Sequence, residues 1–313
     1  MAATEDFVIE TSGLTKRYGS VVAVDDLSLR VPRGSVFGLL GPNGAGKTTI
    51  IAALLGLVRA NAGSIRLFGL DIDGSTDEAV RRIGSIMEIP AFYPYLSGRD
   101  NLLYFQGIGG RHDPAEIDRL LELIGLTDRA NARFATYSLG MKHRLGIAYS
   151  LLGDPELLLL DEPSNGLDPA GMAEVRQLIR DLGDGQRTVL LASHLLNEVE
   201  QVCDSVAILS EGRIIAQGGV QELIARQNRL RLRTTDDARA SEILSGLPWV
   251  GSVVAEGQAL IVAAEPDRSW ELTATLAGAD VFVAELATLE TSLEEYFLEV
   301  TGDDETGSGE IAP

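Results

Sequence analysis

The chain has 313 residues, 45% of them hydrophobic, and its formal net charge is −20. This length suits one large or two medium domains, and the acidity excludes a nucleic-acid-binding surface spread over the whole protein. The single cysteine, Cys203, excludes an internal disulfide and suits a reducing compartment. The N-terminus lacks a signal-peptide pattern, and no apolar stretch reaches the roughly 18 residues that a membrane span needs. We therefore expect a cytoplasmic protein that reaches a membrane only through a partner.

The N-terminal part predicts two strands, over residues 7–10 and 21–31, because apolar and polar residues alternate in the second. Tyr18 lies in the loop expected between them. An exposed loop tyrosine is more often a packing residue, but beside a nucleotide site its ring could stack on a base.

A glycine-rich segment follows the apolar run 36–40 and precedes a second apolar run, 50–58. Its spacing, G-x-x-x-x-G-K-T, is the phosphate-binding loop pattern, and the two runs predict the strand and helix that this pattern needs. Glycines allow backbone N–H groups to surround phosphate oxygens at the positive end of a helix. Lys47 would contact the β- and γ-phosphates, and the Thr48 hydroxyl would hold Mg²⁺.

The middle of the chain predicts a helical insert. A short strand over residues 63–69, a short helix over 79–83 and a strand over 83–87 come first. Apolar residues then recur at helical spacing from 98 to 131. This insert, about residues 89–153, separates the phosphate loop from the next strand of the sheet.

Strands and helices alternate after the insert. Helices are expected over residues 141–152 and 170–182, and strands over 157–160 and 188–192. The first of these strands consists of four leucines, which is typical of a parallel strand buried on both faces. The alternation, together with a phosphate loop, predicts a mostly parallel α/β core.

Polar side chains follow both of these strands. Asp161 and Glu162 come after the leucine strand, and His194 comes shortly after the next. Asp161 could hold Mg²⁺ or its water, and Glu162 could polarise an attacking water as a general base. The alternatives are ordinary solvated carboxylates and a hydrogen-bonded structural histidine. Two adjacent acids after a buried strand are costly without a cation or donors, which favours a functional site.

The order of these motifs resembles that of the ATP-binding cassette (ABC) transporter ATPases, from residue 7 to about residue 225. The resemblance is carried by Tyr18, residues 41–49, Ser138-Leu139-Gly140-Met141, Asp161-Glu162, Gly166-Leu167-Asp168 and His194. It implies an α/β P-loop ABC-type ATPase core with a helical subdomain. ATP and Mg²⁺ are the cofactors that it implies, and ATP hydrolysis is the activity.

The resemblance also implies which residues bind the cofactors. Tyr18 would stack on the adenine ring. The phosphates would be held by Gly41, Pro42, Asn43, Gly44, Ala45, Gly46, Lys47, Thr48 and Thr49. The metal would be held by Thr48, by Asp161 and by Glu88, which occupies the Q-loop.

The resemblance also implies that each catalytic site is formed by two chains. Ser138 and Gly140 would belong to the signature motif, which binds the γ-phosphate of ATP held by the other subunit. Asp168 would lie in the D-loop at the dimer interface. Glu162 would be the catalytic base and His194 the switch histidine. Because this chain has one phosphate loop and one signature, we expect a homodimer on ATP binding.

Two positions depart from the family pattern. Glu88 stands where the family usually has glutamine, which keeps an oxygen acceptor but adds charge. Met141 replaces the signature glutamine and cannot donate its hydrogen bonds. Both departures, and the segments 89–98 and 137–148 around them, are similar to the bacterial antibiotic-resistance and antimicrobial-peptide exporter branch.

Exporters of this branch imply a separate transmembrane permease, with the ATPase at the inner face of the cell membrane. Phe92, Tyr93 and Tyr95 would offer an aromatic surface to the permease's coupling helix. The alternative, that these rings pack locally, stays open from the sequence.

The pattern changes after residue 225. Residues 226–302 predict a small α+β domain with the order β-α-β-β-α-β. Its last segment is similar to the terminal helix of the accessory domain in drug-exporter ATPases. Residues 303–313 contain four acids and no bases, and we expect an acidic, disordered tail.

The leading functional hypothesis is an ATPase subunit that powers export of a drug or antimicrobial peptide. A soluble ABC protein acting on ribosomes or DNA is one alternative, but those proteins resemble tandem cassettes or carry coiled coils. An importer or a transporter of lipid-linked substrates is another, and a non-catalytic ATP-gated module is a third. The intact Glu162 and His194 argue against the last, and the acidity argues against a nucleic-acid partner.

Overall fold

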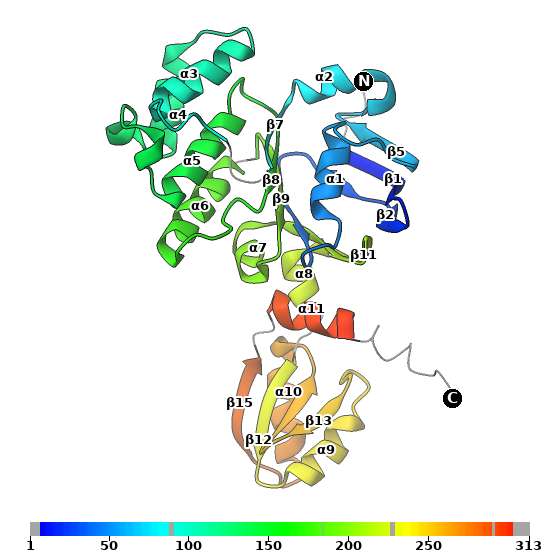
Figure 1. Ribbon diagram of the computed structural model, residues 1–313. Coiled ribbons are helices and arrows are strands. Elements are labelled where there is room, and N and C mark those ends of the chain that lie inside the picture. Colours follow the sequence, from blue (N-terminus) through cyan, green and yellow to red (C-terminus); the bar gives the residue numbers. More distant parts are fainter. Residues whose placement is uncertain (1–6, 88–90, 184, 226–228, 290–291, 303–313) are drawn as a thin grey trace, which may run out of the picture. The chain divides into compact units, whose positions relative to one another are not determined.

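The computed structural model describes residues 7–87, 91–183, 185–225, 229–289 and 292–302. Glu88 and the acidic tail, 303–313, lie outside these described residues. The chain divides into two compact units, residues 1–218 and 219–313 (Figure 1). The division falls earlier than the boundary expected near residue 225, because helix α8 (Val220–Ala225) packs against α11 (Leu293–Gly302) in the second unit.

The first unit is built on a six-stranded sheet with the order β11-β10-β4-β9-β8-β7. The strands are β4 (Val36–Leu40), β7 (Ile83–Met87), β8 (Leu157–Asp161), β9 (Thr188–Ser193), β10 (Ser205–Ser210) and β11 (Arg213–Gly219). Four neighbouring pairs, from β10 to β7, are parallel, as predicted. Every residue of β4, β8 and β9 is buried, which is why these strands are apolar almost throughout.

A second, antiparallel sheet was not anticipated. It joins β1 (Phe7–Tyr18), β2 (Val21–Leu27), β3 (Arg30–Pro32), β5 (Ala62–Leu67) and β6 (Leu70–Asp71). The expected strand 7–10 runs on to Tyr18, so Tyr18 ends a strand. The expected strand 21–31 is two strands, β2 and β3, because Ser28 and Leu29 between them are not in strand conformation. The Thr11 hydroxyl bridges the break, donating to Leu27 O at 3.1 Å and accepting from Leu29 N at 2.9 Å.

Helices α1 (Lys47–Leu54), α2 (Ile72–Val80), α6 (Pro169–Leu182) and α7 (Leu196–Val202) complete this part of the first unit. Helix α1 contacts β2 of the antiparallel sheet and β8 and β9 of the parallel sheet (Figure 1). Ile50, Ile51 and Leu54 of α1 are fully buried in one core that side chains of both sheets share. The phosphate loop is therefore anchored at both ends, by a buried strand and by a buried helix.

The predicted helical insert is present. It contains α3 (Gly98–Ile108), α4 (Pro114–Leu123), two short 3₁₀ helices (Thr127–Arg129 and Phe134–Thr136) and α5 (Leu139–Ser150). Each of the three α-helices begins with an N-cap residue whose side chain accepts hydrogen bonds from backbone N–H groups of the first turn; these residues are Ser97 for α3, Asp113 for α4 and Ser138 for α5.

The aromatic segment before α3 divides between core and surface. Phe92 is buried and lies edge-on to Phe105, Phe134 and Tyr149, at centroid distances of 5.7, 5.1 and 6.0 Å. Of the two alternatives that the sequence left open, local packing therefore accounts for Phe92. Tyr95 is 67% exposed and remains available for a partner.

The second unit has the predicted order β-α-β-β-α-β. Its elements are β12 (Arg229–Thr234), α9 (Asp237–Ser245), β13 (Val253–Glu256), β14 (Ala259–Ala263), α10 (Ser269–Ala277) and β15 (Val283–Leu289). The sheet order β13-β14-β12-β15, with antiparallel pairing throughout, gives a ferredoxin-like fold. Leucines of β12 pack against Leu244 of α9 and Leu272 of α10, so both helices cover one face of the sheet.

No helix within the described ranges has both the length and the apolar character that crossing a bilayer would demand.

Candidate functional site

The phosphate loop lies between the end of β4 and the start of α1, the context that its sequence pattern requires. Gly44 and Gly46 have φ values of 88° and 102°, which side-chain-bearing residues rarely adopt. A Cβ on Gly46 would lie 2.4 Å from Ala23 O, so the loop can approach β2 only as glycine. A Cβ on Gly44 would meet no atom within 4 Å. The loop is thus a compact backbone turn with an open outer side, which fits a phosphate chain.

Lys47 opens α1 and is only 6% exposed. Its ammonium donates to Gly41 O at 2.7 Å and to Pro42 O at 3.3 Å, both within the loop. The same nitrogen lies 3.4 Å from Oε1 of Glu162. The one cation of the loop is therefore fixed at its centre and joined to the carboxylate that follows β8.

Thr48 and Asp161 come together from different elements. Thr48 lies in the first turn of α1 and donates its hydroxyl hydrogen to Oδ2 of Asp161 at 2.7 Å. Asp161 is the last residue of β8 and is 4% exposed. Parallel pairing sets Asp161 opposite Ala192 of β9, so the carboxyl ends of both strands reach the loop side by side.

Glu162 has a left-handed backbone, with a φ of 49°, and its N–H donates to Ala192 O at 2.9 Å. This turn directs the carboxylate back over the end of the sheet. Oε2 lies 2.8 Å from Nδ1 of His194, which follows β9. Lys47, Glu162 and His194 therefore form one contiguous polar chain, which the sequence predicted only as separate motifs.

The signature and D-loop residues gather elsewhere in the unit. Ser138 caps α5, accepting from Met141 N at 3.2 Å, and Asp168 caps α6, accepting from Gly171 N at 3.1 Å. A Cβ on Gly140 would lie 4.0 Å from Leu167, so these two loops are neighbours. Helix α5 packs against α3, α4, α6 and β7, whereas α1 packs against β2, β8 and β9. The predicted site is thus divided into a phosphate-loop half and a signature half.

Tyr18 ends β1 and is 48% exposed. Sequence reasoning missed its neighbour: the Lys16 ammonium lies 4.9 Å from the Tyr18 ring centroid and donates to Arg59 O at 2.7 Å. The i, i+2 spacing on a strand would have revealed this pair. Glu88, the expected third metal ligand, lies outside the described residues.

His143 is a second residue that sequence reasoning missed. It lies one turn after Gly140 on α5 and is 6% exposed. Burial lowers the pKa of His143, and the backbone of Pro163 opposes that shift.

The oxygen donors near the loop, Thr48 and Asp161, suit a hard cation that takes its other ligands from outside the protein. Among the described residues, no group of three or more His, Cys, Asp or Glu side chains could hold a metal. A threonine hydroxyl beside one carboxylate instead fits Mg²⁺, which takes its remaining ligands from phosphates and water.

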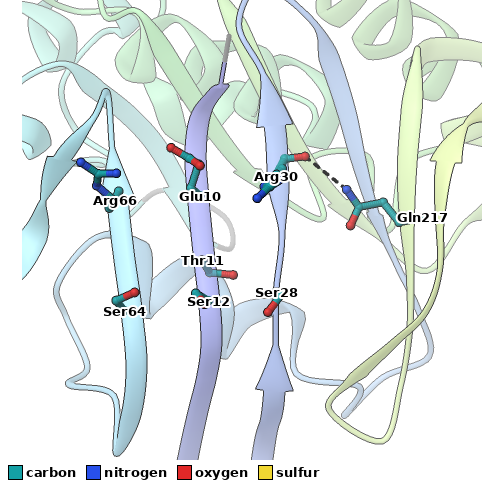
Figure 2. Close-up of a pocket in the computed structure, with 8 residues that line it drawn as sticks. All are labelled: Glu10, Thr11, Ser12, Ser28, Arg30, Ser64, Arg66 and Gln217. Atoms are coloured by element: carbon teal, nitrogen blue, oxygen red, sulfur yellow. Dashed lines mark hydrogen bonds between the residues drawn. The ribbon is translucent and has the colours of Figure 1, made fainter. Parts of the chain in front are cut away.

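A separate polar hollow of about 490 Å³ lies on the antiparallel sheet. Figure 2 shows Arg30, Glu10 and Arg66 in one row across β3, β1 and β5, with Ser12 and Ser64 in a second row. Opposite charges on adjacent strands stabilise an exposed sheet face. The hollow contains none of the predicted site residues, and its charge pattern is accounted for by this cross-strand pairing.

Comparison with known proteins identifies the family. The family model described as "ABC transporter" matches residues 24–165. The chain is 39% identical to the bacitracin transport ATP-binding protein BcrA of Bacillus licheniformis over 298 residues, covering 94% of this chain and 97% of BcrA. The chain belongs to the ATP-binding subunits of ABC transporters.

Other ABC proteins agree with this assignment. The daunorubicin resistance ATP-binding protein DrrA3 of Streptomyces coeruleorubidus is 38% identical, over 96% of this chain and 97% of its own. A solved ATP-binding subunit of an ABC transporter is 30% identical with a TM-score of 0.61, covering 69% of this chain and 91% of that chain. This chain is therefore a nucleotide-binding ABC ATPase of the antibiotic-resistance branch, and as a transporter subunit it works with a separate permease.

Proposed function

We propose that this ABC ATPase hydrolyses Mg²⁺-ATP as a homodimer and thereby powers a permease that exports a drug or antimicrobial peptide. The observation that carries the proposal is the chain of contacts from Lys47 through Glu162 to His194. It joins a phosphate-binding cation, a base and an orienting group in the order that ATP hydrolysis needs.

Glu162 is the proposed general base. One carboxylate oxygen is held by His194 and the other lies near Lys47, so the carboxylate is positioned to accept a proton from water at the γ-phosphate. When ATP binds, its phosphates take the place of the loop carbonyls around Lys47. Mg²⁺, which Thr48 and Asp161 would hold, supplies charge neutralisation at the β- and γ-phosphate oxygens.

The divided site supports the dimer. Ser138 is exposed, and it lies in the signature half and not in the phosphate-loop half. A second copy would bring its Ser138 and Gly140 to the γ-phosphate and its Asp168 to the interface. Two ATP molecules between two copies would then complete two equivalent sites.

The transport role is supported by the relatives, whose names refer to bacitracin transport and to daunorubicin resistance. The ATPase would lie at the cytoplasmic face of the membrane, bound to its permease. Tyr95 and Tyr104, 67% and 45% exposed, provide an aromatic surface for that contact. Tyr93 lies between them, at centroid distances of 5.7 and 5.0 Å.

The nucleotide site is tested by titrating ATP into Lys47→Ala. Loss of the central ammonium should abolish binding, whereas Arg119→Ala, on exposed α4 surface, should bind like the parent chain. Undiminished ATP binding by Lys47→Ala would refute the site.

The partner is tested by isolating the tagged Glu162→Gln chain with ATP from its own membranes in mild detergent. A stoichiometric multi-span protein would support the transporter complex. Ribosomal proteins, or the chain alone, would instead favour a soluble ABC protein. Uptake of labelled drug into inside-out vesicles on adding ATP would support export, and release would indicate import.

A further inference from the structure

The second unit carries a row of arginines on the sheet face that its helices leave open. Leu230 and Leu232 of β12 are 1% and 0% exposed and point toward α9 and α10. Alternation along the strand directs Arg231 and Arg233 to the other face, where both are exposed. Arg229 continues the same row.

This row is unusual for its surroundings. Residues 219–313 contain six basic residues, all arginines, against eighteen acidic ones, and three of the six lie in β12. The few basic residues of an acidic domain would ordinarily be interspersed among its acidic residues, yet here three of the six arginines line one central strand. Solvation alone gives no reason for that concentration.

The neighbouring strands leave the centre of the row without an opposing charge. Arg231 lies opposite Ala287 of β15 and Ile261 of β14, and within the described residues no carboxylate pairs with it. Arg233 lies opposite Glu285, but that pair is 3.5 Å apart and its side chains are 46% and 40% exposed. Such an exposed pair is easily exchanged for another carboxylate.

We propose that the acidic C-terminal segment, residues 303–313, binds the arginine row of β12 in its own chain. The segment has four carboxylates, Asp303, Asp304, Glu305 and Glu310, and no base. Planar guanidinium groups pair with carboxylates through two parallel hydrogen bonds, so the two surfaces are complementary in charge and geometry.

The attachment of the segment permits this contact. It follows α11, whose Leu293 is fully buried and which packs against α8 of the same unit. The four carboxylates are the first, second, third and eighth residues after Gly302, so an extended chain carries them at most about 4, 7, 11 and 29 Å from it, whereas a unit of this size has a radius of gyration of about 12 Å. Glu310 can therefore reach well beyond the radius of the unit, and Asp303, Asp304 and Glu305 would contact arginines within about 11 Å of the end of α11.

Covalent attachment also lowers the affinity that the contact needs. A short tether gives an effective concentration in the roughly millimolar range, so a dissociation constant of about 0.1 to 1 mM in trans suffices for occupancy within the chain. The contact should weaken with salt, because exposed charges are screened.

The experiment titrates a synthetic peptide of residues 303–313 into a chain that ends at Gly302. We expect binding at low salt and at least about fivefold weaker binding at 0.5 M NaCl. The full-length chain should bind the added peptide at least fivefold more weakly, since its own segment competes. A peptide with its acids changed to the corresponding amides should not bind.

Two variants of the shortened chain localise the contact. Arg231→Ser with Arg233→Ser should abolish peptide binding, whereas Arg239→Ser, an exposed arginine of α9, should leave it unchanged. Equal binding by the full-length and shortened chains, or unchanged binding by the double variant, would overturn the proposal. Self-association of the full-length chain that disappears with the segment would overturn binding within one chain, and assign the contact to a second copy.

Discussion

Oε2 of Glu162 lies 2.8 Å from Nδ1 of His194, although 32 positions separate the two residues. Parallel pairing of β8 with β9 brings them together, because each follows the carboxyl end of its strand. The histidine thus fixes the orientation of the carboxylate, and the left-handed backbone of Glu162 fixes its direction. Substitution of Glu162, the base, should therefore differ in its effect from substitution of His194, which orients it.

Glu162→Gln should retain ATP binding but lose hydrolysis by at least about 100-fold, because an amide cannot accept the proton from water. The stalled chain should also accumulate as an ATP-bound dimer. Steady-state phosphate release and gel filtration with ATP measure both effects. Glu122→Gln, on the exposed side of α4, serves as the control. Hydrolysis at the parent rate would show that Glu162 is not the base.

His194→Ala should lower kcat by up to about 100-fold while the KM for ATP changes little, since a misplaced base slows the reaction step and not binding. His112→Ala removes an exposed histidine from the same chain and should have no effect. A rise in KM without a fall in kcat would mean that His194 contributes to binding and not to positioning of Glu162.

Gly46→Ala should destabilise the protein more than Gly44→Ala. Both substitutions force a positive φ on a side-chain-bearing residue, at a cost of about 1 to 2 kcal/mol. Only the Gly46 Cβ collides with backbone, at 2.4 Å from Ala23 O, so the loop must also shift. Urea denaturation midpoints of the two variants compare these costs directly. Equal midpoints would show that the loop relaxes freely away from β2.

Acid should weaken the first unit through His143. Burial lowers its pKa in the folded protein, so below the ordinary histidine pKa of about 6.5 the unfolded chain binds a proton that the folded chain resists. This stability contribution is intact above pH 6.5 and is lost as the pH falls toward the folded pKa. Tm measured from pH 7.5 to 5.5 should therefore fall less steeply in His143→Gln than in the parent chain or in His112→Gln. Parallel Tm profiles would contradict this.

The strand-and-helix frame of the nucleotide half could be predicted because its signals are local. Four consecutive leucines, a glycine loop between apolar runs and polar residues after each strand predict the arrangement of Lys47, Asp161 and Glu162. These residues contact one another because the strands are parallel, so that the carboxyl ends of neighbouring strands lie side by side.

The antiparallel sheet could not be predicted in the same way. Beyond Glu10, strand β1 continues through Thr11 and Ser12, whose strand conformation depends on pairing with β5, and on to Leu14, which pairs with β2. The break after Leu27 likewise depends on the Thr11 hydroxyl, which comes from another strand. Phe92 shows the same limit, because its burial depends on rings contributed by three distant segments.

The separation of the signature half from the phosphate-loop half has a genetic consequence. In a dimer built as proposed, each chain lends its phosphate loop to one site and its signature to the other. A copy that lacks Lys47 therefore removes one of the two sites from the pair into which it is incorporated, even when the other copy is normal. Expressing Lys47→Ala beside the normal gene should suppress transport by more than the defective fraction of chains, which is the behaviour of a dominant allele.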